Sequence, residues 1–222
     1  PGTGCLNNKL KKVYFISGLG ADKRIFSFLD LSFCEPVFID WITPLKNEKL
    51  ESYALRLRQQ IPEESPWIVG ISFGGMLTVE IAKADPAVHA IILSSNKTKK
   101  EFPVYFRAGL YLPLYKWSPA RLSKKFTLRT SSLLGGTNEA EKKLLHQIIR
   151  ESDIHFVRWA ISAILHWKNM TVPENIIHIH GTADKLLPSR YVKADYLIAG
   201  GTHVMTLDKH PEISQLLQQL IQ

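Results

Sequence analysis

The 222-residue sequence contains only two cysteines, Cys5 and Cys34, and no cysteine–histidine spacing typical of a zinc site. Two cysteines are too few for a disulfide framework, so we expect free thiols and a reducing compartment. The sequence also lacks any run of roughly 20 apolar residues that would span a bilayer. Its first residues lack the apolar core of a signal peptide. These absences together predict a cytoplasmic protein without a transmembrane segment.

The sequence has no compositional bias towards disorder, collagen or a disulfide scaffold. Hydrophobic residues make up 45% and charged residues 22% of the chain, which are ordinary proportions for a globular protein. Its length fits a single domain that buries roughly 70% of the surface of the unfolded chain. The formal net charge of +8 is compatible with acidic partners, including nucleic acid, but charge alone identifies none.

Short apolar runs alternate with helical patterns along much of the chain. The runs, rich in β-branched and aromatic residues, predict buried strands at 13–16, 37–41, 67–70, 90–93, 176–179 and 196–198. Apolar residues with helical spacing occur between Leu50 and Ile61 and between Ile213 and Leu220. The alternation predicts an α/β fold, with a mostly parallel sheet of about six strands covered by helices on both faces. Ligands of such a sheet bind beyond the carboxyl ends of its strands.

Residues 97–171 interrupt this alternation, because they show helical patterning without a convincing strand. We therefore expect a core formed by residues 1–96 and 172–222 and a helical cap insertion at 97–171. The last helix of the insertion is predicted from apolar residues that share one face between Phe156 and Trp167. Ser152 or Asp153 is the expected cap of that helix.

Positive charge is concentrated in the first part of the insertion. Between residues 97 and 130 there is one acid, Glu101, against nine basic residues: Lys97, Lys99, Lys100, Arg107, Lys116, Arg121, Lys124, Lys125 and Arg129. If this segment covers the active site, its charge would favour anionic substrates. The alternative is a solvated helical face that keeps the insertion soluble.

The segment from Trp67 to Met76 runs from a predicted strand directly into a predicted helix and contains G-x-S-x-G at Gly70, Ser72 and Gly74. A nucleophile elbow needs such a tight turn, in which the residues two positions either side of the serine lack bulk. The turn would present the Ser72 hydroxyl and make the N–H of Phe73 one donor to an oxyanion. The alternative is a glycine-rich junction in which Ser72 only caps the helix.

In this context the sequence resembles the α/β-hydrolase superfamily, and it is most similar to small, capped bacterial members. The resemblance covers nearly the whole chain. It implies that the second oxyanion donor comes from the loop Ile16-Ser-Gly-Leu-Gly-Ala-Asp22, with Leu19 as the donor. The family's usual His is replaced here by Ser17. These glycines are also compatible with a simple turn, and Asp22 with the N-cap of a helix.

The resemblance also implies a base and an acid. His203 lies in a Gly-Gly-Thr-His segment after the last strand, at the family's position for the general base. Asp184 lies in His180-Gly-Thr-Ala-Asp184, which resembles the family's H-G-x-x-D segment. The order Ser72, Asp184, His203 is the one that this fold requires. An Asx-type turn is the alternative role for Asp184, and Asp195 is expected to be solvated or structural.

Six other histidines are assigned structural places. We expect His178 and His180 to pack within a strand, and His146, His155, His166 and His210 to belong to helices. No carboxylate follows the strand at 90–93, where some relatives carry the acid, because the residues there are Ser94, Ser95 and Asn96.

The favoured function is hydrolysis of a small-molecule carboxylic ester or thioester through an acyl-enzyme, without metal or organic cofactor. The alternatives are a C–C lyase similar to hydroxynitrile lyases and a non-catalytic ligand receptor on the same scaffold. Nucleic-acid or anionic-membrane binding is not favoured as the primary function. It would use aromatic residues that interleave with charge, namely Phe102, Tyr105, Phe106, Tyr111, Tyr115 and Trp117, but aromatics at this spacing more often form a core.

Overall fold

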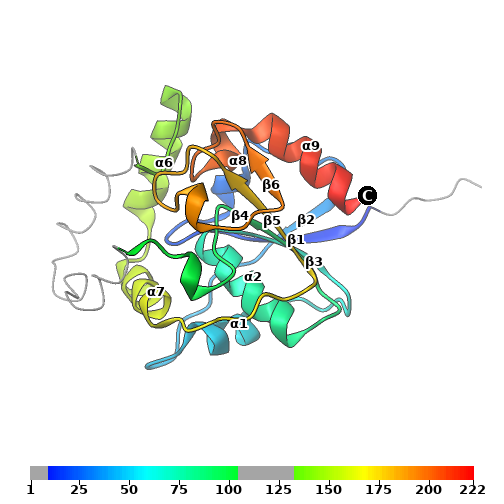
Figure 1. Cartoon of the computed structure of the whole chain (residues 1–222), viewed down its shortest axis with the longest axis vertical. Coiled ribbons are helices and arrows are strands. Elements are labelled where there is room, and N and C mark those ends of the chain that lie inside the picture. The colour runs from blue at the N-terminus through cyan, green and yellow to red at the C-terminus, as the bar shows by residue number, and fades with distance from the viewer. Residues whose placement is uncertain (1–9, 105–132) are drawn as a thin grey trace, which may run out of the picture.

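The computed structural model describes residues 10–104 and 133–222. Its six strands form one parallel sheet in the order β2-β1-β3-β4-β5-β6 (Figure 1). The strands are β1 (Lys12–Ile16), β2 (Glu35–Phe38), β3 (Trp67–Ile71), β4 (His89–Leu93), β5 (Ile176–Gly181) and β6 (Tyr196–Ile198). The sheet confirms the predicted α/β class, its approximate strand number and its parallel pairing.

Helices cover both faces of the sheet (Figure 1). One face packs against α1 (Leu50–Arg58), α2 (Phe73–Ala84) and α7 (Ile154–His166). The other packs against α6 (Glu139–Glu151), α8 (Met205–Asp208), α9 (His210–Ile221) and the 3-10 helix η1 (Lys23–Phe26). Two further 3-10 helices are η2 (Lys99–Glu101) and η4 (Ser189–Tyr191). None of the helices within the described residues is long and apolar enough to cross a membrane.

The strands are apolar on both sides because each side faces a separate hydrophobic core. In β1, Val13 and Phe15 belong to the core beneath α6, α8 and α9, whereas Tyr14 and Ile16 belong to the core beneath α1, α2 and α7. Successive side chains of a strand point to opposite faces, so both sets must be apolar. This explains why the strands lack the alternation of a half-exposed sheet.

Helices α6 and α7 lie between β4 and β5 in the chain, where the insertion was predicted. Asp153 caps α7 by accepting a hydrogen bond from the N–H of His155, and Phe156 packs on Trp41 with 4.9 Å between ring centroids. The predicted helix and one of its two predicted caps are therefore confirmed. The remaining middle of the predicted insertion, residues 105–132, lies outside the described residues.

The first turn of α2 lies directly against the end of β1. A side chain at Gly74 would overlap with the carbonyl oxygens of Ile16 and Ser17, which are backbone atoms and cannot swing away. Glycine at this position therefore lets the helix that follows Ser72 approach the loop after β1, and it sets the distance between these two segments.

We predict that Gly74→Ala lowers the free energy of unfolding by about 1–3 kcal/mol, because the added methyl group forces backbone atoms apart. Intrinsic helix propensity acts in the opposite direction and favours Ala by about 1 kcal/mol. The measurement is a denaturant melt, with Gly18→Ala as the matched control. The nearest atom to a Cβ at Gly18 lies at 3.5 Å, an ordinary contact, so this control should melt close to wild type. A Gly74→Ala protein as stable as wild type would contradict the packing argument.

Candidate active site

Ser72 occupies the single residue between β3 and α2, and its backbone has an uncommon conformation. Its φ of 53° and ψ of −116° are those of the first central residue of a type II′ turn, a position that favours glycine. A Cβ at Gly70 would overlap with the Thr78 hydroxyl and with the carbonyl of Gly74. The predicted strand–turn–helix junction is therefore present, and both flanking glycines are required by close contacts.

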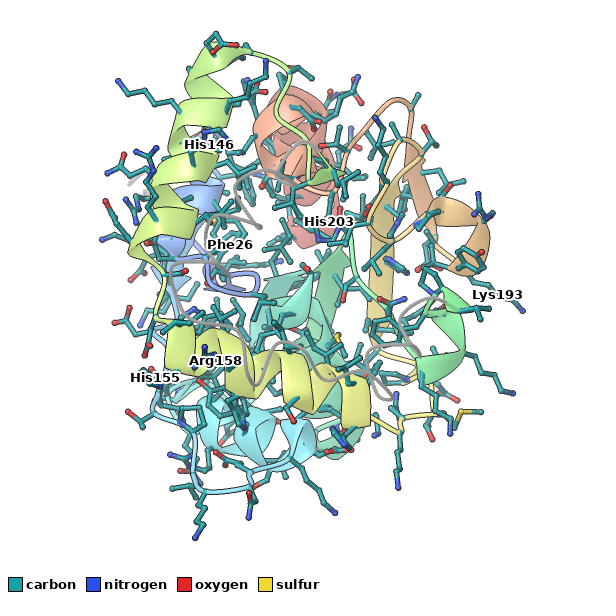
Figure 2. All side chains as sticks on the ribbon, turned by 90° about the vertical axis from the view of Figure 1, so that its left-hand side faces the viewer. Phe26, His146, His155, Arg158, Lys193 and His203 are labelled. Atoms are coloured by element: carbon teal, nitrogen blue, oxygen red, sulfur yellow. The ribbon has the colours of Figure 1, made fainter. Side chains whose placement is uncertain are left out.

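The structure brings Ser72, His203 and Asp184 into one hydrogen-bonded series. Nε2 of His203 lies 2.9 Å from Oγ of Ser72, and Nδ1 of His203 lies 2.8 Å from Oδ2 of Asp184. An ionised carboxylate only accepts hydrogen bonds, so Nδ1 carries the proton in the neutral imidazole and Nε2 presents its lone pair to the hydroxyl. In Figure 2, which views the molecule from the side of α6 and α7, His203 lies to the right of α6 and above α7.

Two loops that leave neighbouring strands hold Asp184 and His203 together. Asp184 follows β5 and His203 follows β6, and the N–H of Ala183 donates to the carbonyl of Gly201 at 2.9 Å. A side chain at Gly181 would overlap with that same carbonyl. The glycines of the two predicted segments therefore allow the loops to touch, and this contact places the imidazole over the carboxylate.

Asp184 uses its two carboxylate oxygens for different purposes. Oδ1 accepts the N–H groups of Leu186 and Leu187 at 2.9 and 2.8 Å, whereas Oδ2 faces His203. Burial raises the pKa of Asp184, but the charge and hydrogen bond of His203 and the Leu187 N–H together outweigh burial and hold the pKa below its ordinary value. Asp184 therefore lies beside His203, as predicted, and it also accepts the backbone N–H groups of an Asx-type turn, which was the alternative role.

A buried histidine pair supports the Asp184 loop from the sheet side. Nε2 of His180 donates to the carbonyl of Leu187 at 2.7 Å, since a carbonyl only accepts, and its Nδ1 lies 3.1 Å from Nε2 of His178. Burial lowers the pKa of both histidines, and the charge of Lys97 lowers the pKa of His178 further. Both are therefore neutral, and packing within a strand is confirmed for the pair. The sequence pattern did not reveal the contact with the Asp184 loop.

The two expected oxyanion donors lie beside Ser72. Phe73 is the first residue of α2, so its N–H has no acceptor within the helix. Leu19 lies in a turn closed by a 3.0 Å hydrogen bond from the N–H of Ala21 to the carbonyl of Gly18. Leu19 and Phe73 both line the cavity that contains Ser72. Asp22 accepts the N–H of Arg24 and caps η1, which is the alternative considered for that residue.

A cavity of about 270 Å³ adjoins Ser72 and His203. Its described lining is apolar except for Ser72, His203 and Asn96, and the apolar lining includes Ile71, Met76, Phe102, Leu134, Leu145, Ile148, Ile149, Ile164 and Leu187. A larger cavity of about 480 Å³ lies beyond Gly20 and Ala21, but Ser72 and His203 do not line it. The smaller cavity is therefore the candidate binding site for a reacting molecule.

The described residues contain no cluster of three or more His, Cys, Asp or Glu side chains arranged to hold a metal ion. Of the basic residues in the predicted charged segment, Lys97 is buried whereas Lys99 and Lys100 are exposed. Those from Arg107 to Arg129 lie outside the described residues. The expected effect of this charge on substrate choice stays a prediction.

The strained turn at Ser72 predicts a difference between two variants that both lack the hydroxyl. Ser72→Gly should be about 1 kcal/mol more stable than Ser72→Ala, because glycine adopts a positive φ without steric cost. For a chain of this size, that difference corresponds to a rise of about 2–4 °C in Tm. Thermal melts of the two variants measure it, and equal Tm values would contradict strain at this residue.

The geometry also ranks the two carboxylates near the site. Asp184→Asn should lower kcat/KM for a cleaved substrate by about 10³-fold to 10⁴-fold, because the amide favours the wrong imidazole tautomer. Asp195→Asn is the matched control. Asp195 is exposed and its Oδ2 accepts the backbone N–H of His178 at 2.7 Å, a contact that the amide oxygen of Asn preserves. Steady-state kinetics of both variants decide the matter, and a larger loss in Asp195→Asn would refute the assignment.

Comparisons with known proteins identify the fold. No protein-family model matches the chain, and no curated protein matches its sequence. Solved structures do match, among them an esterase from Exiguobacterium antarcticum, with a TM-score of 0.75 and 14% identity over 96% of this chain and 92% of that one. A lipase-esterase related protein from Clostridium acetobutylicum gives a TM-score of 0.70 and 16% identity over 96% of both chains.

A bromoperoxidase from Bacillus anthracis is similar to the same extent, with a TM-score of 0.69 and 16% identity over 96% of this chain and 92% of that one. Proteins with different activities therefore share this architecture, and the likeness alone assigns no reaction. It agrees with the parallel six-stranded sheet and the strand–turn–helix junction at Ser72. The chain has the α/β-hydrolase fold.

Proposed function

We propose that the protein is a serine hydrolase that cleaves a carboxylic ester or thioester through an acyl-enzyme. The observation that carries the proposal is the hydrogen-bonded series from Ser72 through His203 to Asp184, with 2.9 and 2.8 Å between the bonded atoms. A serine hydroxyl is a weak nucleophile at neutral pH unless a base removes its proton, and this arrangement supplies the base and orients it.

In the first half of the proposed reaction, Oγ of Ser72 attacks the carbonyl carbon while its proton passes to Nε2 of His203. The carbonyl oxygen becomes an oxyanion and accepts hydrogen bonds from the N–H groups of Leu19 and Phe73. Asp184 stabilises the imidazolium. His203 then gives its proton to the departing alcohol or thiol, which leaves the acyl group on Ser72.

In the second half, a water molecule attacks the acyl group and gives its proton to His203. The second oxyanion binds the same two N–H groups. Collapse of this intermediate breaks the bond to Oγ, which takes back the proton and releases the carboxylic acid. Each proton that His203 takes from an attacking oxygen is passed to the departing atom, the oxygen or sulfur of the leaving group in the first half and Oγ of Ser72 in the second, so the cycle needs no metal ion or organic cofactor.

The lining of the cavity supports an apolar acyl group as the part held beside Ser72. Leu145, Ile148 and Ile149 of α6 and Ile164 of α7 form one part of the wall. We propose that residues 97–171 form a cap on the core of residues 1–96 and 172–222, because these helices contribute apolar surface to the cavity. The neighbouring structures include several esterases, which agrees with this reaction class.

The central experiment combines turnover with covalent labelling. The wild-type protein should hydrolyse members of a panel of nitrophenyl esters and acyl thioesters and should bind a fluorophosphonate probe at Ser72. Ser72→Ala should lose the label and lower kcat by about 10⁴-fold or more, while its melt shows a folded protein. Ser65→Ala is the matched control, because Ser65 precedes β3 and therefore lies at the amino ends of the strands, whereas Ser72 lies at their carboxyl ends.

Retention of more than a tenth of wild-type turnover by Ser72→Ala would refute the proposed nucleophile. Cleavage of a cyanohydrin without ester hydrolysis would favour the C–C lyase instead. A protein that binds small ligands but neither labels nor turns over any substrate would be the non-catalytic member of the fold.

A further inference from the structure

Asn96 is a buried polar residue in the wall of the candidate active site that the proposed reaction does not use. It follows β4 at the carboxyl edge of the sheet, in the segment that contains Ser94 and Ser95. Its side chain has no solvent-exposed surface, and it lines the same cavity of about 270 Å³ as Ser72 and His203. Within the described lining, it is the polar group left over once the nucleophile and the base are assigned.

The orientation of the Asn96 amide is determined by its neighbour. Nδ2 donates to the carbonyl of Glu101 at 3.0 Å. A carbonyl only accepts, so turning the amide around would place two oxygens against each other. Oδ1 is therefore fixed as the remaining polar atom, and it has no hydrogen-bond partner among the residues that the structure describes.

The segment that carries Asn96 is itself firmly held. The carboxylate of Glu101 accepts the N–H groups of Lys97 and Thr98, the second of these in the capping box of η2. Nδ2 of Asn169 donates to the carbonyl of Lys97 at 2.7 Å. Asn96 is thus held by its own bond to Glu101 and by the backbone contacts of the two residues that follow it, so its amide is not free to rotate towards another donor.

An unpartnered acceptor in a buried site is costly. Leaving a buried polar atom without a hydrogen bond destabilises a protein by about 1–3 kcal/mol, and in a native structure such an atom calls for an explanation. An aliphatic side chain of similar size would avoid the cost in this apolar wall. A ligand that brings its own donor would instead complete the hydrogen bonding of Oδ1 when it binds.

We propose that Oδ1 of Asn96 accepts a hydrogen bond from the substrate. The preferred substrate is accordingly an ester or thioester whose otherwise apolar acyl chain carries one uncharged donor, a hydroxyl group or an amide N–H. The proposal rests on the proposed function. It assigns the donor to the acyl part because that part stays bound to Ser72 through both halves of the reaction, whereas the alcohol or thiol leaves after the first.

The test compares three kinds of nitrophenyl ester of equal chain length as substrates of the wild-type protein: an unsubstituted acyl ester, its hydroxyacyl analogues and their methoxy ethers. The methoxy ethers keep an oxygen but lack the donor. We expect kcat/KM for the hydroxyacyl ester with the best-placed hydroxyl to exceed that for the other two by about tenfold, the gain of one additional hydrogen bond. Equal values for the hydroxy and methoxy esters at every position would overturn the proposal without any variant.

Asn96→Leu removes the acceptor at similar volume, and it should reduce this tenfold preference to about one. Asn169→Leu is the matched control, because it loosens the same segment by removing the bond to Lys97 but leaves Oδ1 of Asn96 in place. The control should keep the preference even if its Tm falls. A preference that survives in Asn96→Leu, or that is lost in both variants equally, would contradict a direct contact.

A binding measurement separates this inference from the hydrolase proposal. Calorimetry with Ser72→Ala and the same esters measures affinity without turnover, and the hydroxyacyl ester should bind about tenfold more tightly than its methoxy ether. If the wild-type protein neither labels with fluorophosphonate nor cleaves any ester, the proposed reaction fails. Even then, the difference in affinity between the hydroxyacyl ester and its methoxy ether tests the role of Oδ1. This difference should disappear when Asn96→Leu is added to Ser72→Ala.

Discussion

The reversal of the chain from β3 into α2 at Ser72 is the constraint on which the rest of the site depends. Both backbone groups of Ser72 are bonded to the end of β4 and the segment that follows it. The N–H of Ser72 donates to the carbonyl of Leu93, and the carbonyl of Ser72 accepts a hydrogen bond from the hydroxyl of Ser95 at 2.7 Å. A residue held at positive φ persists only where its surroundings determine it in this way. The end of β4 therefore fixes the direction of the hydroxyl, and the same segment continues to Asn96.

The sheet and the proposed triad were predictable because each depends on local patterns or on chain order. Buried parallel strands show as short apolar runs, and the turn at Ser72 shows as glycines two residues away on each side. Strand β2 shows where this reasoning is limited, since the apolar run suggested 37–41 but the strand is Glu35–Phe38. Trp41 lies beyond the strand and instead packs on Phe156, a contact between residues far apart in the chain.

The remaining features of the site depend on side-chain geometry that spacing does not contain. His180 was predictable as a buried strand residue, but its bond to the carbonyl of Leu187 exists only because the Asp184 loop folds back over β5. The sequence also does not show that Asp184 both forms an Asx-type turn and faces His203, because the same residue pattern is expected for either role. Asn96 was recognised only as a position without a carboxylate, and its unpartnered oxygen is a property of the assembled wall.

The apolar cavity gives these polar groups their effect. Hydrogen bonds and charges act more strongly where water is excluded, so apolar walls would strengthen the proposed interaction of the Leu19 and Phe73 N–H groups with a developing oxyanion. The same exclusion raises the cost of every buried polar atom that remains unpaired. Asp184 avoids that cost through the N–H groups of Leu186 and Leu187 and through His203. Oδ1 of Asn96 does not avoid it, and an apolar wall that tolerates one such atom is suited to distinguish a ligand that supplies a donor from one that lacks it.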